Sequence, residues 1–470
     1  MEDGHADEVE EGAAGRTFAL QGLTWPEEVR QFVAMARNYA EGALRLHRTR
    51  GDVVVTRLPE RVVGFAHPRH VRRLLRTNVL NYPKSDDYDS LRPLLGDGIF
   101  VSEGDVWTRQ RRLLAPEFRG GAVPRYLPVI VRDVEAFFAE LWDPAIGGPA
   151  RDIGHDMMRL TLWVIGDAIF ARDFRGQADA IGRDLEICLA QATLQLITGG
   201  LLRPWIPTPG NLRARRAERS LDATVAGLIA AARTTASPSD TNMLSRLLLS
   251  TDRGGHPALD DRELADQVKS LILAGHETTS LVLTWTLYLL ASAPAVLARL
   301  VDEVDEVLGA RAPGPDDVPR LVYTRMVLLE AMRLYPPVPA VTRTARAADE
   351  FDGVHIAAGT KVCVLPYVTQ RLAEFWPRPD EFDPERFAPD RVAAITPFSY
   401  LPFLLGRRAC LGEQFAMLES VVALAMIVAR YRFTRADDGP IATRPISTLR
   451  LARPLMMRIE RRTAVAGAPR

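Results

Sequence analysis

One ten-residue segment constrains this chain more than any other feature. It reads FLLGRRACLG at positions 403–412 and leads into a long apolar helical pattern that runs from about position 411 to 429. A cysteine at a helix start faces unpaired backbone N–H groups and the positive end of the helix dipole. The pKa of the Cys410 thiol should therefore fall, which favours a metal ligand or a nucleophile. A lone cysteine at such a place is more often an inert core residue, and the spacing of five residue types argues against that alternative.

The residues around Cys410 suit a flat ligand with an anionic group. Gly406 and Gly412 allow a sharp turn and a close approach of the ligand to the backbone. Phe403 is expected to shield the sulfur from water, and Arg408 to pair with the anionic group of the ligand.

A second segment, AGHETT at positions 274–279, interrupts a long helical pattern. Gly275 costs about 1 kcal/mol relative to alanine inside a helix. The hydroxyl of Thr278 can bond back to the carbonyl of Ala274 and bend the helix. Together these residues open a groove that a hydroxyl and the carboxylate of Glu277 face. The alternative is a packing glycine beside a Glu/Thr pair on a solvated face.

Two further pairs lie at helical spacing. Glu330 and Arg333 are three residues apart, so their charges can meet on one helix face. Trp107 and Arg111 are four residues apart and can point at one site. Each pair has a plain alternative, a surface ion pair for the first and a snorkelling arginine for the second.

These motifs resemble the cytochrome P-450 family, the haem-thiolate monooxygenases. The resemblance implies that Cys410 is the axial ligand of haem b (heme b, iron protoporphyrin IX). It implies that Glu277 is the acid and Thr278 the alcohol that organise protons for dioxygen cleavage. His276 fills the variable position of that motif and is not expected to be a ligand. The resemblance also implies haem-binding roles for Trp107, Arg111, Arg343 and Arg408 at the propionates, for Ala274 and Gly275 beside the oxygen pocket, and for Phe403, Gly406 and Gly412 in the ligand loop.

The same resemblance predicts a buried triad of Glu330, Arg333 and Arg386 that supports the cysteine loop without taking part in the chemistry. One position departs from the family pattern. Gln370 stands where the family usually has histidine before an arginine, and we expect a local change there rather than a loss of activity.

The predicted fold is mainly α with a small β portion, the cytochrome P-450 fold, with haem between a long distal helix and the cysteine loop. Residues 1–17 are expected to form a disordered tail, and residues 18–470 a single haem-thiolate domain. Residues 52–66 are typical of a β-hairpin. Strand-like runs return at 354–356, 361–365 and 449–459. Helical patterns cover 107–116, 124–142, 153–172, 179–197, 211–234, 261–292, 294–308, 319–334 and 412–430.

Charge and cysteine content limit the class of protein and the cellular compartment. Lys+Arg and Asp+Glu both number 59, which gives no sign of a nucleic-acid binder. Three cysteines cannot form a disulfide framework, and Cys188 and Cys363 fit plain core packing. The acidic N-terminal segment is typical of neither a secretory signal nor a membrane anchor, and the apolar run 281–298 fits a buried helix. A soluble, cytoplasmic protein is expected.

The expected reaction inserts one oxygen atom from dioxygen into an apolar small molecule, by hydroxylation or epoxidation of a fatty acid, terpenoid, steroid or polyketide. Electrons are expected from a ferredoxin or flavodoxin with its NAD(P)H-dependent reductase, docking on a basic patch of Arg109, Arg112 and Arg407. The stretch after the cysteine helix is too short for a fused reductase. A peroxide-driven hydroxylase, a haem-thiolate isomerase or dehydratase, and a non-catalytic haem-binding protein remain as alternatives.

The cavity for the substrate is expected to be lined by apolar segments. These are the 88–101 loop, the 185–205 region, the helix face around Leu271 and Ala274, positions 338–341, and the turn at 446–448.

Overall fold

Helices make up most of the molecule. The computed structural model describes residues 24–198, 205–238, 240, 242–251, 255–309 and 311–462. The predicted disordered tail at 1–17 lies outside these residues. The α-helices in chain order are α1 (Trp25–Arg37), α2 (Tyr39–Arg50), α3 (Pro68–Arg72), α4 (Arg92–Leu95), α5 (Gly104–Leu114), α6 (Leu127–Phe137), α7 (Ile153–Phe170), α8 (Ala178–Ile197), α9 (Pro209–Thr235), α10 (Met243–Leu249), α11 (Asp261–Leu290), α12 (Pro294–Val307), α13 (Val322–Leu334), α14 (Pro366–Thr369) and α15 (Glu413–Arg430).

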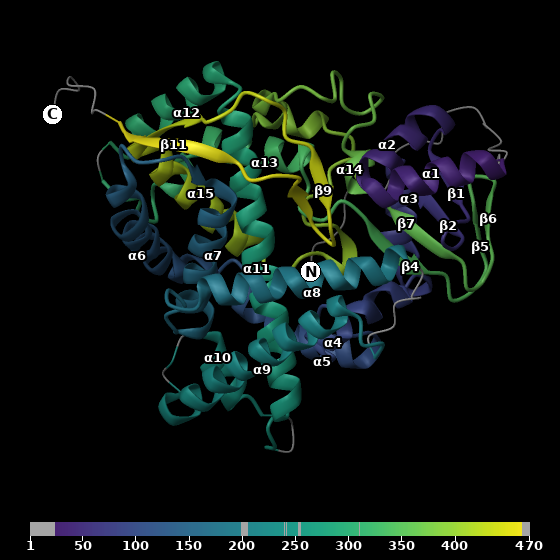
Figure 1. The fold of residues 1–470 in the computed structure, drawn as a ribbon, viewed down its shortest axis with the longest axis horizontal. Coiled ribbons are helices and arrows are strands. Elements are labelled where there is room, and N and C mark those ends of the chain that lie inside the picture. Colours follow the sequence, from purple (N-terminus) through teal and green to yellow (C-terminus); the bar gives the residue numbers. More distant parts are fainter. Residues whose placement is uncertain are drawn as a thin grey trace, which may run out of the picture.

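The strands are short and gather in small sheets on the side of the molecule drawn at the right of Figure 1 and along its top. The larger sheet has the order β1-β2-β7-β4, in which β2 and β7 run parallel and the other neighbours antiparallel. A second sheet has the order β3-β11-β8, and β9–β10 and β5–β6 form two-stranded ribbons. The strands are β1 (Val53–Thr56), β2 (Val62–Phe65), β3 (Arg151–Asp152), β4 (Val341–Thr344), β5 (Asp349–Phe351), β6 (Val354–Ile356), β7 (Lys361–Val364), β8 (Tyr431–Arg435), β9 (Thr443–Pro445), β10 (Leu449–Leu451) and β11 (Met456–Arg461).

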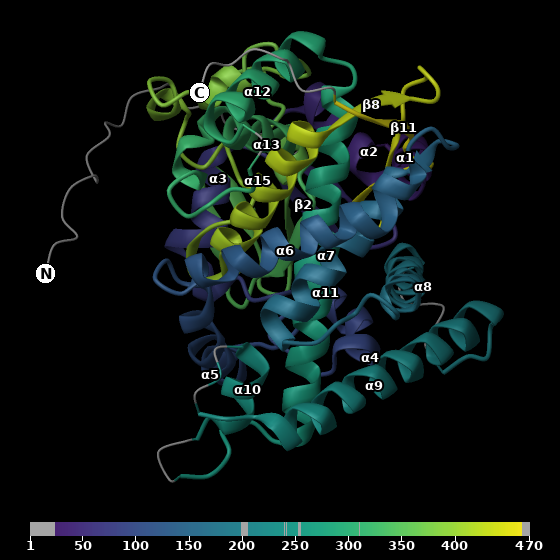
Figure 2. The ribbon, with the colours of Figure 1, turned by 90° about the vertical axis from the view of Figure 1, so that its left-hand side faces the viewer.

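Helix α11 is the central element. Its N-terminus is fixed by a capping box in which Asp260 and Glu263 each accept from the other's backbone N–H. From Val268 onward its side chains are buried on nearly every face, because α7, α13 and α15 pack around it. Figure 2 shows α11 running through the middle of the molecule, with α6, α7 and α15 beside it.

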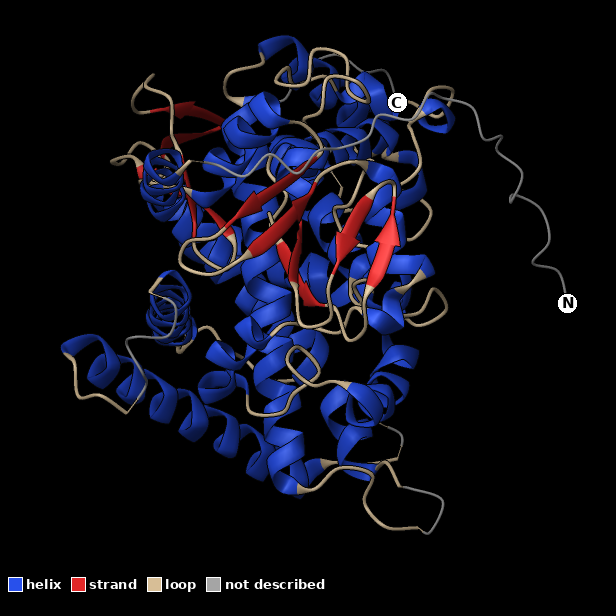
Figure 3. Cartoon of the chain, turned by 90° about the vertical axis from the view of Figure 1, so that its right-hand side faces the viewer, coloured by secondary structure: helices blue, strands red, loops and turns tan. Residues whose placement is uncertain are grey.

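Two layers flank this helical centre. Helices α1 and α2 pack on each other, and α2 contacts β1, so the N-terminal helices lie against the larger sheet. Figure 3 shows strands gathered on the side of the molecule that faces the viewer. Helices α8 and α9 pair and extend outward from α11. The apolar residues of the larger sheet form a separate core cluster from that of the helices. A space between the larger sheet and the helical centre can therefore be lined from both sides.

The predicted fold class, mainly α with a small β portion, is confirmed. Every predicted helix is present with ends shifted by a few residues, and the predicted hairpin is β1–β2. The predicted strand 449–459 is two strands, since Pro454 interrupts the run. The sequence pattern missed several elements, most of them short, namely α1, α2, α3, α4, α10, α14, β3, β4, β5, β8 and β9.

Among the described residues, no single helix has both the length and the apolar composition of a membrane span. Helices α11 and α12 meet that criterion only when taken together, across a bend of 115°.

Candidate active site

The loop that carries Cys410 is shaped by one required glycine. Gly406 has φ +72°, and a Cβ there would lie 2.1 Å from the carbonyl oxygen of Leu75. Only glycine fits a backbone that is both left-handed and this close to a neighbour. The turn closes when the Cys410 N–H donates to the carbonyl of Phe403 at 2.9 Å. Gly412, the N-cap of α15, has φ −87° and nothing within 4 Å of the position that a Cβ would take, so no packing demand holds it as glycine.

Cys410 differs from the other two cysteines. Cys188 and Cys363 are buried as predicted, whereas the Cys410 side chain is exposed although protein surrounds it closely. The sulfur of Cys410 is therefore accessible to a ligand. The prediction of a lowered thiol pKa is wrong for the protein alone, because burial raises the pKa of Cys410 more than the N–H groups of Gly412 and Glu413 lower it.

Three guanidinium groups surround the indole of Trp107, which α5 places beside the cysteine loop. The distances to the ring centroid are 5.4 Å for Arg111, 5.3 Å for Arg407 and 4.3 Å for Arg408. Arg111 donates to the carbonyl of Ala409 at 3.0 Å. Trp107 and Arg111 therefore lie together, as their spacing predicts, and Arg111 also holds the loop backbone one residue before the cysteine.

The arginines assigned to an anionic group retain unused donors. Arg408 forms an ion pair with Glu103, yet its Nη1 has no hydrogen-bond partner within the described chain. Arg343 on β4 donates to the hydroxyl of Tyr88 at 3.3 Å and the carbonyl of Thr342 at 2.7 Å, and its buried Nε lacks a partner among the same residues. Buried unpaired N–H groups are costly, so these two point to an acceptor that belongs there.

Lys84 adds a third cation that the sequence pattern did not reveal. Its ammonium donates to the carbonyls of Ile99, Phe100 and Ser102 at 3.2, 2.6 and 3.1 Å. Burial, and then the charge of Arg408, lowers the pKa of Lys84 to about 7. These three carbonyls use all three donors of the Lys84 ammonium, so Lys84 adds positive charge beside Arg408 and Arg343 and no free donor.

Helix α11 presents Ala274 and Thr278 to the same interior. The Thr278 hydroxyl donates to the carbonyl of Ala274 at 2.8 Å, which is the predicted back-bond, and Ala274 is exposed in an otherwise buried stretch. Gly275 turns the other way. A Cβ there would lie 2.2 Å from Cδ1 of Ile165, so this glycine allows α11 to approach α7. For Gly275 the packing alternative therefore describes the structure.

Glu277 is buried rather than solvated, and it is not free. Arg450 on β10 donates to both of its oxygens, from Nε at 2.8 Å and from Nη2 at 2.7 Å. Thr448 donates to Oε1 at 2.8 Å. Burial acts to raise the pKa of Glu277, but Arg450, His276 and these bonds together hold it below its usual value. The sequence analysis missed Arg450, because no motif or helical spacing connects two positions that are 173 residues apart.

A cavity of about 350 Å³ adjoins Ala274 and Thr278. Its walls include Tyr88, Leu189, Val338 and Ser447, from four of the predicted segments. The structure adds a wall that the sequence did not predict, made by α1, α2 and the hairpin β1–β2. Leu271 and Ile446 do not line this cavity. Residues 199–204 of the predicted 185–205 wall lie outside the described residues.

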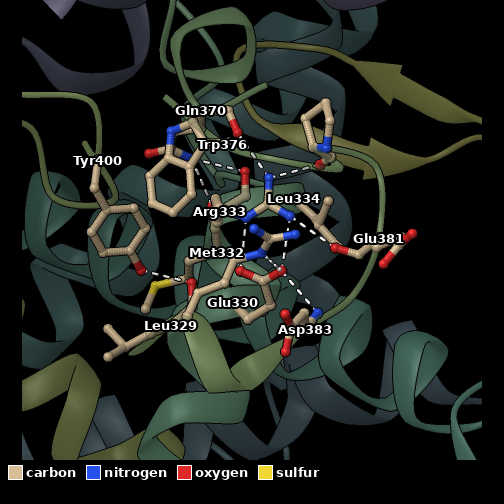
Figure 4. A network of polar contacts seen from close by, with 12 residues as sticks. Leu329, Glu330, Met332, Arg333, Leu334, Gln370, Trp376, Glu381, Asp383 and Tyr400 are labelled. Carbon is tan, nitrogen blue, oxygen red and sulfur yellow. Dashed lines mark hydrogen bonds and ion pairs between the residues drawn. The ribbon is translucent and has the colours of Figure 1, made fainter. Parts of the chain in front are cut away.

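The predicted support triad is assembled as a buried network (Figure 4). Arg333 donates to both oxygens of Glu330 at 2.7 and 2.8 Å, and Arg386 donates to Glu330 at 3.3 Å. Arg333 also donates to the carbonyls of Gln370, Pro379 and Glu381. One guanidinium thus ties α13 to the two segments that precede the cysteine loop.

Gln370, the departure from the family pattern, joins this network. Its amide donates to the carbonyls of Met332 and Arg333 at 3.0 and 2.9 Å, and its oxygen accepts from the N–H of Leu401 at 2.7 Å. The glutamine therefore links α13 directly to the start of the loop, which agrees with a local change and no loss of connection.

The predicted basic patch is smaller than the sequence indicated. Arg109 forms an ion pair with Glu263 and donates to the carbonyl of Ala258. Arg407 donates to the hydroxyl of Thr108 at 3.0 Å, and Arg112 is exposed. Because the charge of Arg109 is offset, Arg112 and Arg407 remain as the patch beside the cysteine loop.

Comparison with known proteins points to one family. The family model described as Cytochrome P450 matches residues 31–458. The chain is 37% identical over 413 residues to cyclooctatin synthase from Streptomyces melanosporofaciens, covering 87% of this chain and 88% of that one. It is 32% identical over 396 residues to cyclooctat-9-en-7-ol 5-monooxygenase from the same species, covering 81% and 82%. It is 31% identical over 415 residues to pentalenene oxygenase from Streptomyces avermitilis, covering 88% and 91%.

Proposed function

The chain belongs to the cytochrome P450 family of haem-dependent monooxygenases, and from this premise we propose that it oxidises a terpenoid hydrocarbon or alcohol at an unactivated carbon. Enzymes of this family use dioxygen and a redox partner. The observation that carries the proposal is the accessible sulfur of Cys410. Its loop requires a glycine at position 406, and Arg343 and Arg408 nearby have unused buried donors. The proposed cofactor form is haem b.

The residues of the chain are proposed to hold this cofactor from two sides. Cys410 provides the thiolate ligand, and Phe403 and Gly412 complete its loop. Arg343 and Arg408, with Trp107 and Arg111 beside them, hold the propionates through the donors that the protein leaves unpaired. When bound, a thiolate-ligated haem supplies the oxygen chemistry.

Helix α11 is proposed to supply the protons. The Thr278 hydroxyl is held by the carbonyl of Ala274 at 2.8 Å, so its oxygen retains lone pairs toward the cavity. Glu277 is the adjacent acid, and its buried setting excludes bulk water. Placement of a hydroxyl and an acid on neighbouring positions suits stepwise proton delivery to one point in the cavity.

A terpenoid substrate is compatible with the cavity, and the named relatives favour it over the other three classes. The cavity walls are mainly aliphatic and aromatic, with Phe32, Leu189, Leu273 and Val338 among them. Relatives at 31–37% identity are named for cyclooctatin, cyclooctat-9-en-7-ol and pentalenene. A bulky, mostly apolar skeleton can fill such a cavity through burial alone, at about 25 cal/mol per Å² of apolar surface.

The proposed electron donor is a small acidic ferredoxin or flavodoxin with an NAD(P)H-dependent reductase. Arg112 and Arg407 lie beside the cysteine loop, where an acidic partner would approach the ligand side. Charge complementarity there would raise the rate of encounter more than the affinity.

Two measurements test the proposal. The reduced protein with carbon monoxide should absorb at the position typical of thiolate-ligated haem, and Cys410→Ala should abolish that spectrum. Turnover with dioxygen, a surrogate ferredoxin and its reductase should then convert pentalenene or a related cyclic terpenoid to an oxygenated product. Absorption typical of imidazole-ligated haem would refute the thiolate assignment. Product formed with peroxide alone would favour the peroxide-driven hydroxylase. If no apolar ligand gives a product, the non-catalytic haem-binding protein would be favoured.

A further inference from the structure

The turn between β9 and β10 carries Ser447 on the wall of the cavity. The turn closes when the Ile446 N–H donates to the carbonyl of Thr448 at 2.8 Å. It is bonded to α11, because the Thr448 hydroxyl donates to Glu277 at 2.8 Å. It is also bonded to α8, because the Ser447 N–H donates to the Thr193 hydroxyl at 3.2 Å. Ser447 is therefore held in place from two sides of the cavity.

The hydroxyls of Thr193 and Ser447 differ in how their protons are used. A hydroxyl has one proton to donate and two lone pairs that accept. The Thr193 hydroxyl gives its proton to the carbonyl of Leu189 at 2.9 Å. Within the described chain, the Ser447 hydroxyl contacts the Thr193 oxygen at 3.5 Å, which is the outer limit of a hydrogen bond. Ser447 therefore keeps two lone pairs and a weakly held proton for a ligand.

Other hydroxyls on the same wall are bonded at shorter distances. Ser90 donates to the carbonyl of Asp87 at 2.7 Å, and Thr278 donates to that of Ala274 at 2.8 Å. A polar group of a ligand that lay against the aliphatic part of the wall would lose its hydrogen bonds to water without replacement. At Ser447 it would find a partner whose lone pairs are unused.

The charges on the cavity wall are negative. The charged side chains that line the cavity within the described chain are the carboxylates of Glu60, Asp87 and Glu277. Lys361 on β7 pairs with Glu60 and Asp87, and its ammonium also lies 2.8 Å from Asp86. Three carboxylates around one ammonium leave a net negative charge on this side of the cavity. A ligand carboxylate would be repelled there, whereas a neutral hydroxyl would not be.

We propose that the cavity selects a terpenoid that already carries a hydroxyl, that Ser447 binds this hydroxyl, and that the wall carboxylates exclude the corresponding acid. The substrate hydroxyl donates to Oγ of Ser447, and the proton of Ser447 stays on the Thr193 oxygen. Because the turn is bonded to α11 one residue before Thr278, the hydroxyl is held on the side of the cavity where oxidation is proposed. The selection rests on the proposed function, whose substrate class it narrows.

Three diterpenes with one tricyclic skeleton test the selection, namely the hydrocarbon abietadiene, the alcohol abietadienol and the acid abietate. Their dissociation constants are measured on the holoenzyme by calorimetry and by the shift of the haem absorption. Ser447→Ala should weaken binding of the alcohol roughly tenfold and leave that of the hydrocarbon within about twofold, since only the alcohol loses a hydrogen bond.

Ser90→Ala is the matched control, because it removes from the same wall a hydroxyl whose proton is already bonded to Asp87. Tyr39→Phe removes the phenol that lines the cavity from α2. Both variants should bind the alcohol as the wild type does. The proposal is overturned if Ser447→Ala leaves alcohol binding unchanged, if either control loses as much as Ser447→Ala, or if the wild type does not bind the alcohol.

The exclusion of acids is tested by charge. At pH 8 the wild type should bind abietadienol on the order of tenfold more tightly than abietate, and Asp87→Asn should narrow this gap roughly threefold. Asp86→Asn is the control and should narrow the gap less, because the Asp86 side chain is 75% exposed and does not line the cavity. Equal affinities in the wild type, or an unchanged gap in Asp87→Asn, would overturn the exclusion. A missing thiolate spectrum with carbon monoxide would instead overturn the proposed function, so the two failures are distinct.

Discussion

At the scale of single residues, the two glycines of the cysteine motif have different physical roles. Gly406 is left-handed and has a carbonyl oxygen 2.1 Å from the position of a Cβ. Gly412 has an ordinary φ of −87° and open space around that position. The sequence motif treats the two alike. The backbone and its neighbours distinguish them, because the Leu75 carbonyl that excludes a side chain comes from a distant segment.

Gly406→Ala should destabilise the loop by about 3 kcal/mol, since a left-handed alanine and a contact with Leu75 are both unfavourable. We expect a lower midpoint of thermal unfolding and loss of haem during gel filtration. Gly412→Ala is the control and should retain both properties. Equal tolerance of the two substitutions would contradict the assigned role of Gly406.

At the scale of elements, the helix that begins beside Cys410 also carries an unusual buried acid. Neither oxygen of Glu419 on α15 has a hydrogen-bond partner among the described residues, and burial raises its pKa well above the usual value. Asp133 on α6 faces it, and burial together with Asp167 on α7 raises the pKa of Asp133 to about 7. Helices α15 and α6 therefore bring together two carboxyls, Glu419 and Asp133, whose protonated forms are favoured by burial.

The contact between these helices should weaken as the pH rises. Asp133 loses its proton near its ordinary value of 3.8 in the unfolded chain and near 7 in the folded one, so the unfolded state binds fewer protons between these values. The free energy of unfolding should fall across that interval and level off above it. Asp133→Asn should remove this slope. Relative to the wild type, its free energy of unfolding should therefore rise by on the order of 2 kcal/mol from pH 5 to pH 8. Chemical denaturation at both pH values measures the difference.

The control is Asp173→Asn, an exposed carboxylate in the connection between α7 and α8, which should keep the wild-type slope. An unchanged slope in Asp133→Asn would show that Asp133 is ionised in the folded protein at neutral pH, against the direction argued from its burial.

At the scale of the whole molecule, the cavity is lined by α1, α2 and the larger sheet on one side and by α8 and α11 on the other. The substrate side is lined by both layers. Arg112 on α5 is exposed and does not line this cavity, so a partner docked on Arg112 would leave the cavity free. Separate surfaces allow reduction and substrate binding to be changed independently.

Arg112→Glu should slow reduction of the holoenzyme by an acidic ferredoxin roughly tenfold at low ionic strength, and the difference should shrink as salt is added. Stability should change by less than about 0.5 kcal/mol, because the side chain is exposed. Arg216→Glu on α9, which packs on α8 and α11, is the control of equal charge change. Stopped-flow reduction measures both, and equal rates in the two variants would exclude Arg112 from the docking surface.

The sequence by itself determined the helical ranges, the hairpin and the cysteine motif, because each depends on periodicity, turn residues or spacing within a short segment. It also indicated the Thr278 back-bond and the Glu330–Arg333 pair, which join residues one helical turn apart. It missed α1, where Glu28 is the buried residue, and α2, whose buried positions include small or polar residues such as Gly42 and His47.

Only the tertiary structure decided what Glu277, Gly275 and Lys84 contact. Glu277 accepts from Arg450, Gly275 lies against Ile165, and Lys84 lies near the charge of Arg408. Each of these contacts joins segments that lie far apart in the chain. No local pattern encodes such contacts, because they depend on how helices and strands pack. Burial then sets the charge of each group, and therefore the thiol pKa of Cys410 departed from the value that its helix position predicted.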